Sequence, residues 1–156
     1  MKLKIAVLPG DGIGPEVTNQ SIKVLKCIAN KYNHNIELSE GRVGAIAIDE
    51  YNDPYPDITH KLCMDSDAIL FGAIGDPKYD NDPKAKVRPE QGLLKMRKKL
   101  GLFANLRPTI IFESLLDMSP IKEERIKNTN ILFVRELTGG IYFGERGRKD
   151  NDNYAY

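Results

Sequence analysis

The chain has 156 residues, of which 41% are hydrophobic and 29% are charged. This composition is typical of a soluble globular protein, and the length can form one domain. Lysine and arginine number 23 against 22 acidic residues, so charge does not favour binding of nucleic acid or of an acidic membrane surface. We find no apolar run of the length that a signal peptide or a membrane span needs.

The first half of the chain alternates short apolar runs with helical patterns. Residues 3–8 predict a buried strand, which Pro9 and Gly10 end. Pro15 and Glu16 begin a helix that runs to about residue 32. The residues expected to face the sheet from this helix are Val17, Ile22 (or Ser21), Val24, Leu25 and Ile28. We also expect strands at 35–39 and 67–72 and helices at 43–51 and 58–64. This alternation indicates an α/β fold with a parallel sheet.

The two cysteines, Cys27 and Cys63, lack the spacing of metal ligands. Cys27 falls within the apolar pattern of the first helix, so we expect it in the core. We expect both to be reduced thiols of a cytoplasmic protein.

Residues 10–16, GDGIGPE, join the first strand to the first helix. Glycines there allow unusual backbone angles and a close approach of a ligand to the amides. Pro15 stands where the dinucleotide fingerprint has its third glycine, so that motif is absent. The turn therefore either packs the helix on the sheet or binds an anion or cofactor.

The second half begins with residues 73–89, which are rich in Gly, Pro, Asp and Asn and predict a long loop. Loops of this length in compact domains are more often functional than not. After them we expect a helix at 90–99, an extended segment at 102–112 and a strand at 130–136. Residues 145–156 are polar and show no hydrophobic period.

The predicted helix 90–99 places Glu90, Leu93, Leu94 and Arg97 on one face, because residues three and four apart are helical neighbours. Two apolar groups beside a guanidinium suit a ligand with a branched alkyl arm and a carboxylate. The alternative is an ordinary amphipathic helix, with its leucines in the core and its arginine in water.

Two further arginines and one tyrosine are candidate site residues. Arg135 lies in an otherwise apolar strand and needs a partner, because an unpaired buried charge is costly. That partner is either an internal acid, such as Glu113 or Glu136, or a substrate carboxylate, which Arg97 and Arg107 would also bind. Tyr142 follows two glycines and is either a proton donor or a packed aromatic.

Four segments of the chain, taken together, resemble the 3-isopropylmalate dehydrogenases of the isocitrate/isopropylmalate dehydrogenase family. They are KIAVLPGDGIGPEV, SDAILFGAIGDPKYD, GLLKMRKKLGLFANLRP and VRELTGGIYFGERG. The third is the most specific, since isocitrate-specific relatives have a serine-containing segment where this chain has its leucines.

The resemblance implies an α/β fold of two domains that is distinct from the Rossmann arrangement. Residues 1–101 would form the first part of one domain. Residues 102–156 would begin the second, with the start of an arm that contacts a partner subunit in a homodimer. Family members are more than twice this length, so we expect the chain to be an amino-terminal fragment.

The resemblance also implies an activity for the full-length chain: NAD-dependent oxidative decarboxylation of (2R,3S)-3-isopropylmalate to 4-methyl-2-oxopentanoate in leucine biosynthesis. Arg97, Arg107 and Arg135 would bind the malate carboxylates, and Tyr142 would help to protonate the enolate. The residues expected around the isopropyl group are Glu90, Leu93 and Leu94. Those expected to bind NAD are Gly75, Asp76, Pro77, Lys78, Tyr79, Asp80, Arg88, Pro89 and Glu90. Asp76 replaces a glycine often found in the family.

The family also uses Mg²⁺ or Mn²⁺, whose ligands are expected in the part that this chain lacks. Two alternatives stay open. The chain could belong to another β-decarboxylating dehydrogenase, acting on isocitrate, homoisocitrate or tartrate. It could also be a non-catalytic module that binds small anions.

Overall fold

The structure is a computed structural model that describes residues 1–80, 86–139, 143, 148–149 and 154–155. The chain divides into two compact units, Met1–Leu100 and Gly101–Tyr156. In the part that the structure describes, no helix is both long enough and apolar enough to cross a membrane.

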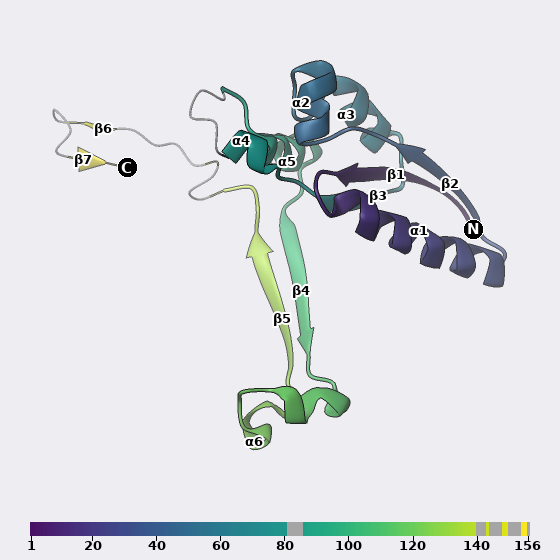
Figure 1. Cartoon of the computed structure of the whole chain (residues 1–156), viewed down its shortest axis with the longest axis vertical. Coiled ribbons are helices and arrows are strands. Elements are labelled where there is room, and N and C mark those ends of the chain that lie inside the picture. Colours follow the sequence, from purple (N-terminus) through teal and green to yellow (C-terminus); the bar gives the residue numbers. More distant parts are fainter. Residues whose placement is uncertain (81–85, 140–142, 144–147, 150–153, 156) are drawn as a thin grey trace. The chain divides into compact units, whose positions relative to one another are not determined.

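The first unit is built on a three-stranded parallel sheet (Figure 1). Its strands are β1 (Lys2–Gly10), β2 (Asn35–Glu40) and β3 (Ala68–Ala73), in the order β2-β1-β3. The parallel sheet that the sequence predicts is confirmed. Because the strands are parallel, their carboxyl ends share one edge, where ligands of open α/β sheets commonly bind.

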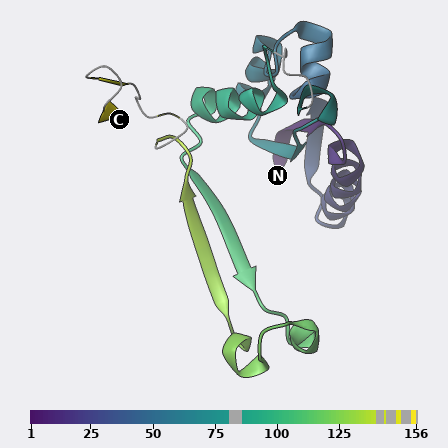
Figure 2. The same cartoon turned by 60° about the vertical axis from the view of Figure 1, so that its left-hand side comes forward.

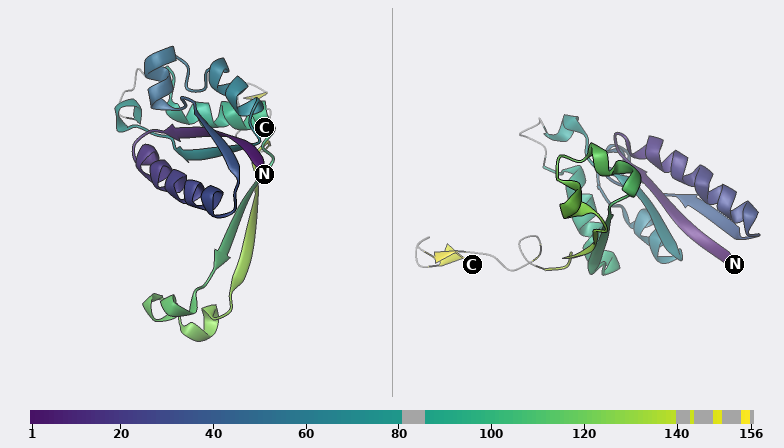
Figure 3. Two further views of the ribbon diagram at one scale, coloured as in Figure 1. Left: turned by 90° about the vertical axis from the view of Figure 1, so that its right-hand side faces the viewer. Right: turned by 90° about the horizontal axis from the view of Figure 1, so that it is seen from below.

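Helices lie on both faces of this sheet (Figure 3). The long helix α1 (Gly14–Lys31) covers one face. The other face carries α2 (Ala45–Tyr51), α3 (Asp57–Met64) and α5 (Pro89–Leu100). Between the sheet and these three helices lies a core cluster, made of Ala6, Leu8, Val43, Tyr55, Cys63 and Met96.

The prediction of which α1 residues face inward is wrong for three positions. Val17, Val24 and Ile28 are exposed, at 45%, 60% and 45% of their surface. The buried residues of α1 are Gly14, Thr18 and Ala29. The helix has two partly apolar sides, and the one with small residues packs on β1 and β3, where Gly14 and Gly72 allow a close approach. Cys27 is likewise exposed and not in the core.

The two thiols should therefore differ in reactivity. Both are free, as predicted, but Cys63 is buried and burial raises its pKa, an effect that its hydrogen bond with Tyr55 opposes. Only the thiolate reacts readily with thiol reagents. We expect a disulfide reagent at pH 7.5 to modify Cys27 at once and Cys63 only in denaturant. Equal rates for the two thiols, read by peptide mass spectrometry, would contradict the packing described here.

The second unit contains a long two-stranded antiparallel ribbon (Figure 2). Its strands are β4 (Ala104–Ile110) and β5 (Asn130–Glu136). They are joined by two short helices that the sequence did not predict, η1 (Glu113–Met118) and α6 (Glu123–Ile126). A short pair, β6 (Arg148–Lys149) and β7 (Tyr154–Ala155), follows within residues expected to be irregular. One face of the ribbon is apolar and exposed within this unit, with Leu106, Ile110, Leu132 and Val134.

Candidate functional site

Asp11 is a buried acid in the turn that follows β1. Its carboxylate accepts hydrogen bonds from the amides of Ala45, Ile46 and Gly75, at 2.8, 3.1 and 3.1 Å. Its own amide donates to the carbonyl oxygen of Ala73 at 2.7 Å. The first two amides begin α2, where helix donors lack internal partners and a negative charge is favourable. Asp11 thus joins three segments at the carboxyl edge of the sheet.

These contacts show that the Asp11 side chain packs the turn of residues 10–16 against α2 and the segment after β3, which supports the packing interpretation. Gly10 has a φ of +72°, and a side chain on it would overlap the carbonyl oxygen of Ala73. Glycine is therefore required here by the close approach of β1 to β3.

A cavity of about 460 Å³ opens beside this turn, at the carboxyl ends of β1 and β2. The charged residues of its lining are Asp11, Glu40, Arg42, Asp49 and Asp76. The Arg42 guanidinium is 2.5 Å from the Glu40 carboxylate and 3.3 Å from that of Glu50. Carboxylates accept hydrogen bonds from hydroxyl and amide groups but repel phosphates. This lining therefore suits a ligand that donates hydrogen bonds from hydroxyl or amide groups better than one that carries phosphates.

The predicted cofactor segment begins after β3 and contains the short helix α4 (Pro77–Asp80). Asp76 starts this turn, because its carboxylate accepts from the amide of Lys78 at 3.0 Å and its carbonyl from that of Tyr79 at 2.9 Å. The side chains of Lys78 and Tyr79 both bind Asp49 of α2. Residues 81–85 lie outside the described part of the chain.

Helix α5 (Pro89–Leu100) starts one residue earlier than the helix predicted at 90–99. The amide of Arg88 donates to Oε1 of Gln91 at 3.2 Å, and the carbonyl of Arg88 accepts from the amide of Gln91 at 3.1 Å. This reciprocal pair and a proline in the first turn are typical of a helix start. Glu90 lies near the predicted cofactor segment, because Oε1 of Glu90 would be 3.4 Å from a Cβ placed on Gly75.

The two sides of α5 have different roles. Gly92 and Met96 are buried against the rest of the unit. Glu90, Leu94 and Arg97 lie on the opposite side of the helix, at spacings of four and three residues. Leu93 lies between these sides and packs against the core cluster. The structure thus brings together the predicted substrate residues of this helix, and it shows that Leu93 also belongs to the core.

Arg107 and Arg135 lie on the same face of the β4–β5 ribbon. Arg135 pairs with Asn105, and Arg107 pairs with Phe133 two residues away, so the arginines are diagonal neighbours. Both are exposed within the second unit. The Glu136 carboxylate accepts hydrogen bonds from the Thr138 hydroxyl and amide and from the Gly139 amide, and these lower the pKa of Glu136.

One predicted site residue has no structural counterpart. Tyr142 lies outside the described residues. Across the described ranges of the chain, no group of three His, Cys, Asp or Glu side chains could hold a metal ion.

The isocitrate/isopropylmalate dehydrogenase family model matches residues 4–156. The chain belongs to this family. It is 53% identical over 152 residues to a 3-isopropylmalate dehydrogenase of Bacteroides fragilis, covering 97% of this chain and 43% of that protein. It is 54% identical over 156 residues to one from Aquifex aeolicus, covering 99% of this chain and 43% of the relative. The chain thus spans about two fifths of the length of these relatives.

Solved structures of the family have the same fold. A β-decarboxylating dehydrogenase from Thermococcus kodakarensis matches with a TM-score of 0.67 and 30% identity, over 99% of this chain and 39% of that one. An isocitrate dehydrogenase from Methylococcus capsulatus matches with a TM-score of 0.69 and 25% identity, over 99% of this chain and 41% of that one. The predicted α/β fold of this family is therefore confirmed over part of its length.

Sequence reasoning missed the residues that hold the site in place. Asp11 was read only as part of a glycine turn, and Asp49 was given no role. Tyr55 is fully buried and donates to or accepts from Nδ1 of His60 at 3.2 Å. The contacts of Asp11 and Asp49 join residues far apart in the chain, and no local spacing signals them.

Proposed function

We propose that this chain is the amino-terminal part of an NAD-dependent 3-isopropylmalate dehydrogenase. The observation that carries the proposal is helix α5, which holds Glu90, Leu94 and Arg97 on the side away from the core. A guanidinium beside an apolar side chain suits a carboxylate that bears an alkyl branch. Relatives at 53% and 54% identity are named as 3-isopropylmalate dehydrogenases, which supports the same substrate here.

The reaction proposed is oxidation of the substrate hydroxyl followed by loss of CO₂. The guanidiniums of Arg97, Arg107 and Arg135 bind the two carboxylates and stabilise the negative charge that develops on the enolate. Leu93 and Leu94 contact the isopropyl group and exclude water from it. Tyr142 helps to return a proton to the enolate.

NAD, when bound, accepts the hydride from the substrate. The residues proposed to hold it are Gly75, Asp76, Pro77, Lys78, Tyr79, Asp80, Arg88, Pro89 and Glu90. Gly75 and Glu90 are neighbours in the first unit, which supports assigning them to one binding region. The acidic lining beside Asp76 would accept hydrogen bonds from ribose hydroxyls.

The remaining parts of the proposal concern the longer protein. The first unit would belong to the large domain, and the second would begin the other domain and its dimer-contacting arm. The divalent metal would be bound by residues of the carboxyl-terminal part, and the active form would be a cytoplasmic homodimer. The two-fifths span of this chain relative to its relatives supports an enzyme that is active only when complete.

The test uses the complete enzyme. The complete enzyme is this chain extended by the residues that its own downstream coding sequence encodes, where the reading frame stays open. Otherwise the chain is extended by the carboxyl-terminal part of the Bacteroides fragilis relative. NAD reduction is measured with 3-isopropylmalate, isocitrate, homoisocitrate and tartrate. We expect the highest kcat/KM with 3-isopropylmalate. Faster turnover of isocitrate would refute the assignment.

The two leucines of α5 should differ when each is replaced by alanine. We expect Leu94→Ala to lower kcat/KM for 3-isopropylmalate at least about tenfold relative to malate, which lacks the isopropyl group. Leu93→Ala should cause a similar loss of selectivity and also destabilise the fold by about 2 kcal/mol, because Leu93 packs against the core cluster. Initial rates and urea unfolding would measure both effects. Equal losses on the two acids would show that these leucines only pack.

A further inference from the structure

Residues 49–57, DEYNDPYPD, connect α2 to α3 and contain aspartates at every fourth position. We call this stretch the aspartate segment. Each of its aspartates, Asp49, Asp53 and Asp57, binds a lysine from a different place in the later sequence. Those lysines belong to the two elements that carry the proposed cofactor and substrate residues.

Asp49 binds the proposed cofactor segment through both of its carboxylate oxygens. Oδ2 is 2.5 Å from Nζ of Lys78, and Oδ1 accepts from the Tyr79 hydroxyl at 2.8 Å. The Lys78 ammonium also lies 5.1 Å from the centre of the Tyr79 ring, within range of a cation–π contact. The hydrogen bonds from Lys78 and Tyr79 lower the pKa of Asp49, so the carboxylate is ionised at neutral pH. Helix α4 is thus fixed to α2 by its two central side chains.

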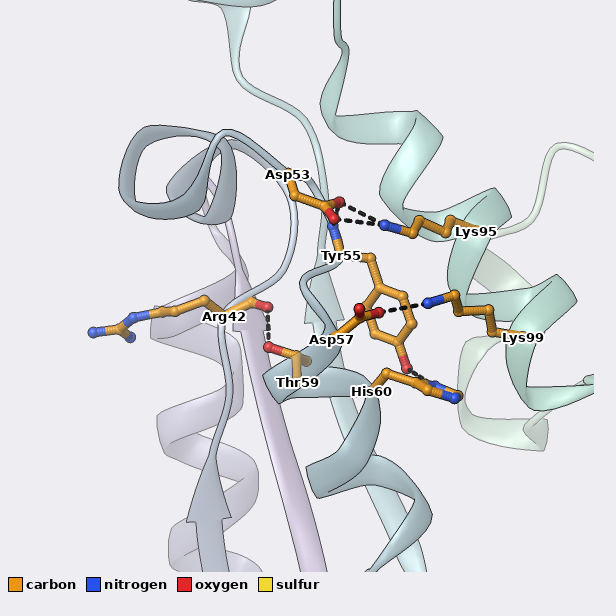
Figure 4. A network of polar contacts seen from close by, with 8 residues as sticks. All are labelled: Arg42, Asp53, Tyr55, Asp57, Thr59, His60, Lys95 and Lys99. Carbon is orange, nitrogen blue, oxygen red and sulfur yellow. Dashed lines mark hydrogen bonds and ion pairs between the residues drawn. The ribbon is translucent and has the colours of Figure 1, made fainter.

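Asp53 and Asp57 bind the substrate helix α5 (Figure 4). Nζ of Lys95 lies 2.9 and 2.6 Å from the two oxygens of Asp53, and Nζ of Lys99 lies 2.6 Å from Oδ1 of Asp57. The two lysines are one helical turn apart, so the two ion pairs are successive contacts along α5. The Lys95–Asp53 pair is partly buried, with about a third of each side chain exposed.

Close backbone packing fixes the same contact. A Cβ on Gly92 would lie 2.5 Å from the carbonyl oxygen of Pro54, so α5 sits directly against this proline. Tyr55 is fully buried beneath the helix, and Pro54 and Pro56 are buried on either side of it. Prolines limit the conformations of the segment, which helps to keep its aspartates in place.

The contacts to the aspartate segment occupy one side of α5. Gly92, Lys95 and Lys99 repeat at spacings of three and four residues, which places them together on the helix. Glu90, Leu94 and Arg97 lie on the opposite side at the same spacings. Any rotation or sliding of α5 against the segment would therefore move the proposed substrate residues by the same amount.

We propose that the aspartate segment positions the two elements of the proposed active site. Asp49 fixes the place of the cofactor segment, and Asp53 and Asp57 fix the place of the substrate helix α5. This inference rests on the proposed function. Asp53 and Asp57 are outside the lining of the cavity beside Asp76. Asp49 is part of that lining, but its two oxygens bind Lys78 and Tyr79, so all three aspartates are positioning residues. Their removal should weaken the binding of chiefly one ligand at a time, because Asp49 holds the cofactor segment whereas Asp53 and Asp57 both hold the substrate helix.

The experiment compares two variants of the complete enzyme, Asp49→Asn and the double variant Asp53→Asn/Asp57→Asn. Exposed ion pairs have modest effects, so we expect Asp49→Asn to raise the KM for NAD about threefold and to leave the KM for 3-isopropylmalate within error. The double variant should raise the KM for 3-isopropylmalate about threefold to tenfold and that for NAD less than twofold, because Lys95 and Lys99 hold the middle and end of α5 while Pro89 and Glu90 stand at its start. The matched control is Glu123→Gln, which removes an ion pair with Lys127 of similar exposure in the second unit.

A second readout does not depend on activity. Hydrogen exchange should quicken at the Tyr79 amide in Asp49→Asn and in α5 in the double variant, with neither change in Glu123→Gln. The positioning role would be overturned if a variant changed both KM values equally or changed neither. It would also be overturned if hydrogen exchange did not quicken at the expected amides. An unsubstituted enzyme that does not oxidise 3-isopropylmalate would instead refute the proposed function, while the exchange data would still decide the inference.

Discussion

Replacement of Arg107 by alanine in the complete enzyme should lower kcat/KM for 3-isopropylmalate about 100- to 1000-fold. Removing one partner of a desolvated guanidinium–carboxylate pair costs about 3–5 kcal/mol, and 1.4 kcal/mol corresponds to a tenfold change. Arg107 is exposed within its own unit, so the same substitution should change the free energy of unfolding by less than about 0.5 kcal/mol. A large kinetic loss with little change in stability would identify a ligand-binding residue.

The matched control is Arg125→Ala, which removes an exposed arginine from α6 in the same unit. We expect its kcat/KM to stay within twofold of the unsubstituted enzyme. Initial rates at varied 3-isopropylmalate and saturating NAD provide the comparison. If both variants lost activity equally, the effect of Arg107 would reflect general charge and not a specific carboxylate contact.

Gly10→Ala should destabilise the first unit by at least about 4 kcal/mol, which is exceptional for a single substitution. The added Cβ would overlap the carbonyl oxygen of Ala73 and lie 2.9 Å from its carbon, and the backbone φ of +72° also disfavours alanine. Relief requires β1 to move away from β3. That movement would break the hydrogen bond from the Asp11 amide to Ala73.

Gly12→Ala separates the steric effect from the backbone effect. Gly12 has a φ of +55°, but the nearest atom to an added Cβ is the Gly75 carbonyl oxygen at 3.7 Å, an ordinary contact. We expect a cost of only about 1–2 kcal/mol, from the left-handed conformation alone. Urea unfolding of the two variants, side by side, measures the difference. Equal destabilisation would mean that the close approach of β1 to β3 is not as described.

Local patterns in the sequence were sufficient to predict most of the regular structure. The aliphatic run that became β1 and the proline at the start of α1 gave bounds within one or two residues of those observed. Strand β5 was predicted with its observed bounds, because its apolar run is flanked by polar residues on both sides. These features depend on neighbours in the chain, and local chemistry determines them.

The errors involve contacts between distant residues. The inward side of α1 depends on where small residues let the helix meet β1 and β3, which hydrophobic spacing does not show. Helices η1 and α6 are short and lack an apolar period, so they gave no signal. The roles of Asp11 and Asp49 arise from partners 29 to 64 positions away along the printed sequence. For the site residues, the sequence predicted the members of α5 but not what holds that helix in place.

The proposed function requires the guanidiniums of Arg97, Arg107 and Arg135 to bind one small diacid in the complete enzyme. The most direct test is a crystal structure of the complete enzyme with 3-isopropylmalate bound, in which the distances from each guanidinium to the substrate carboxylates are measured. We predict that Arg97, Arg107 and Arg135 each place a nitrogen about 2.7–2.9 Å from a substrate oxygen. Arginines that instead pair with acids of the protein, or that point to separate regions, would contradict the account.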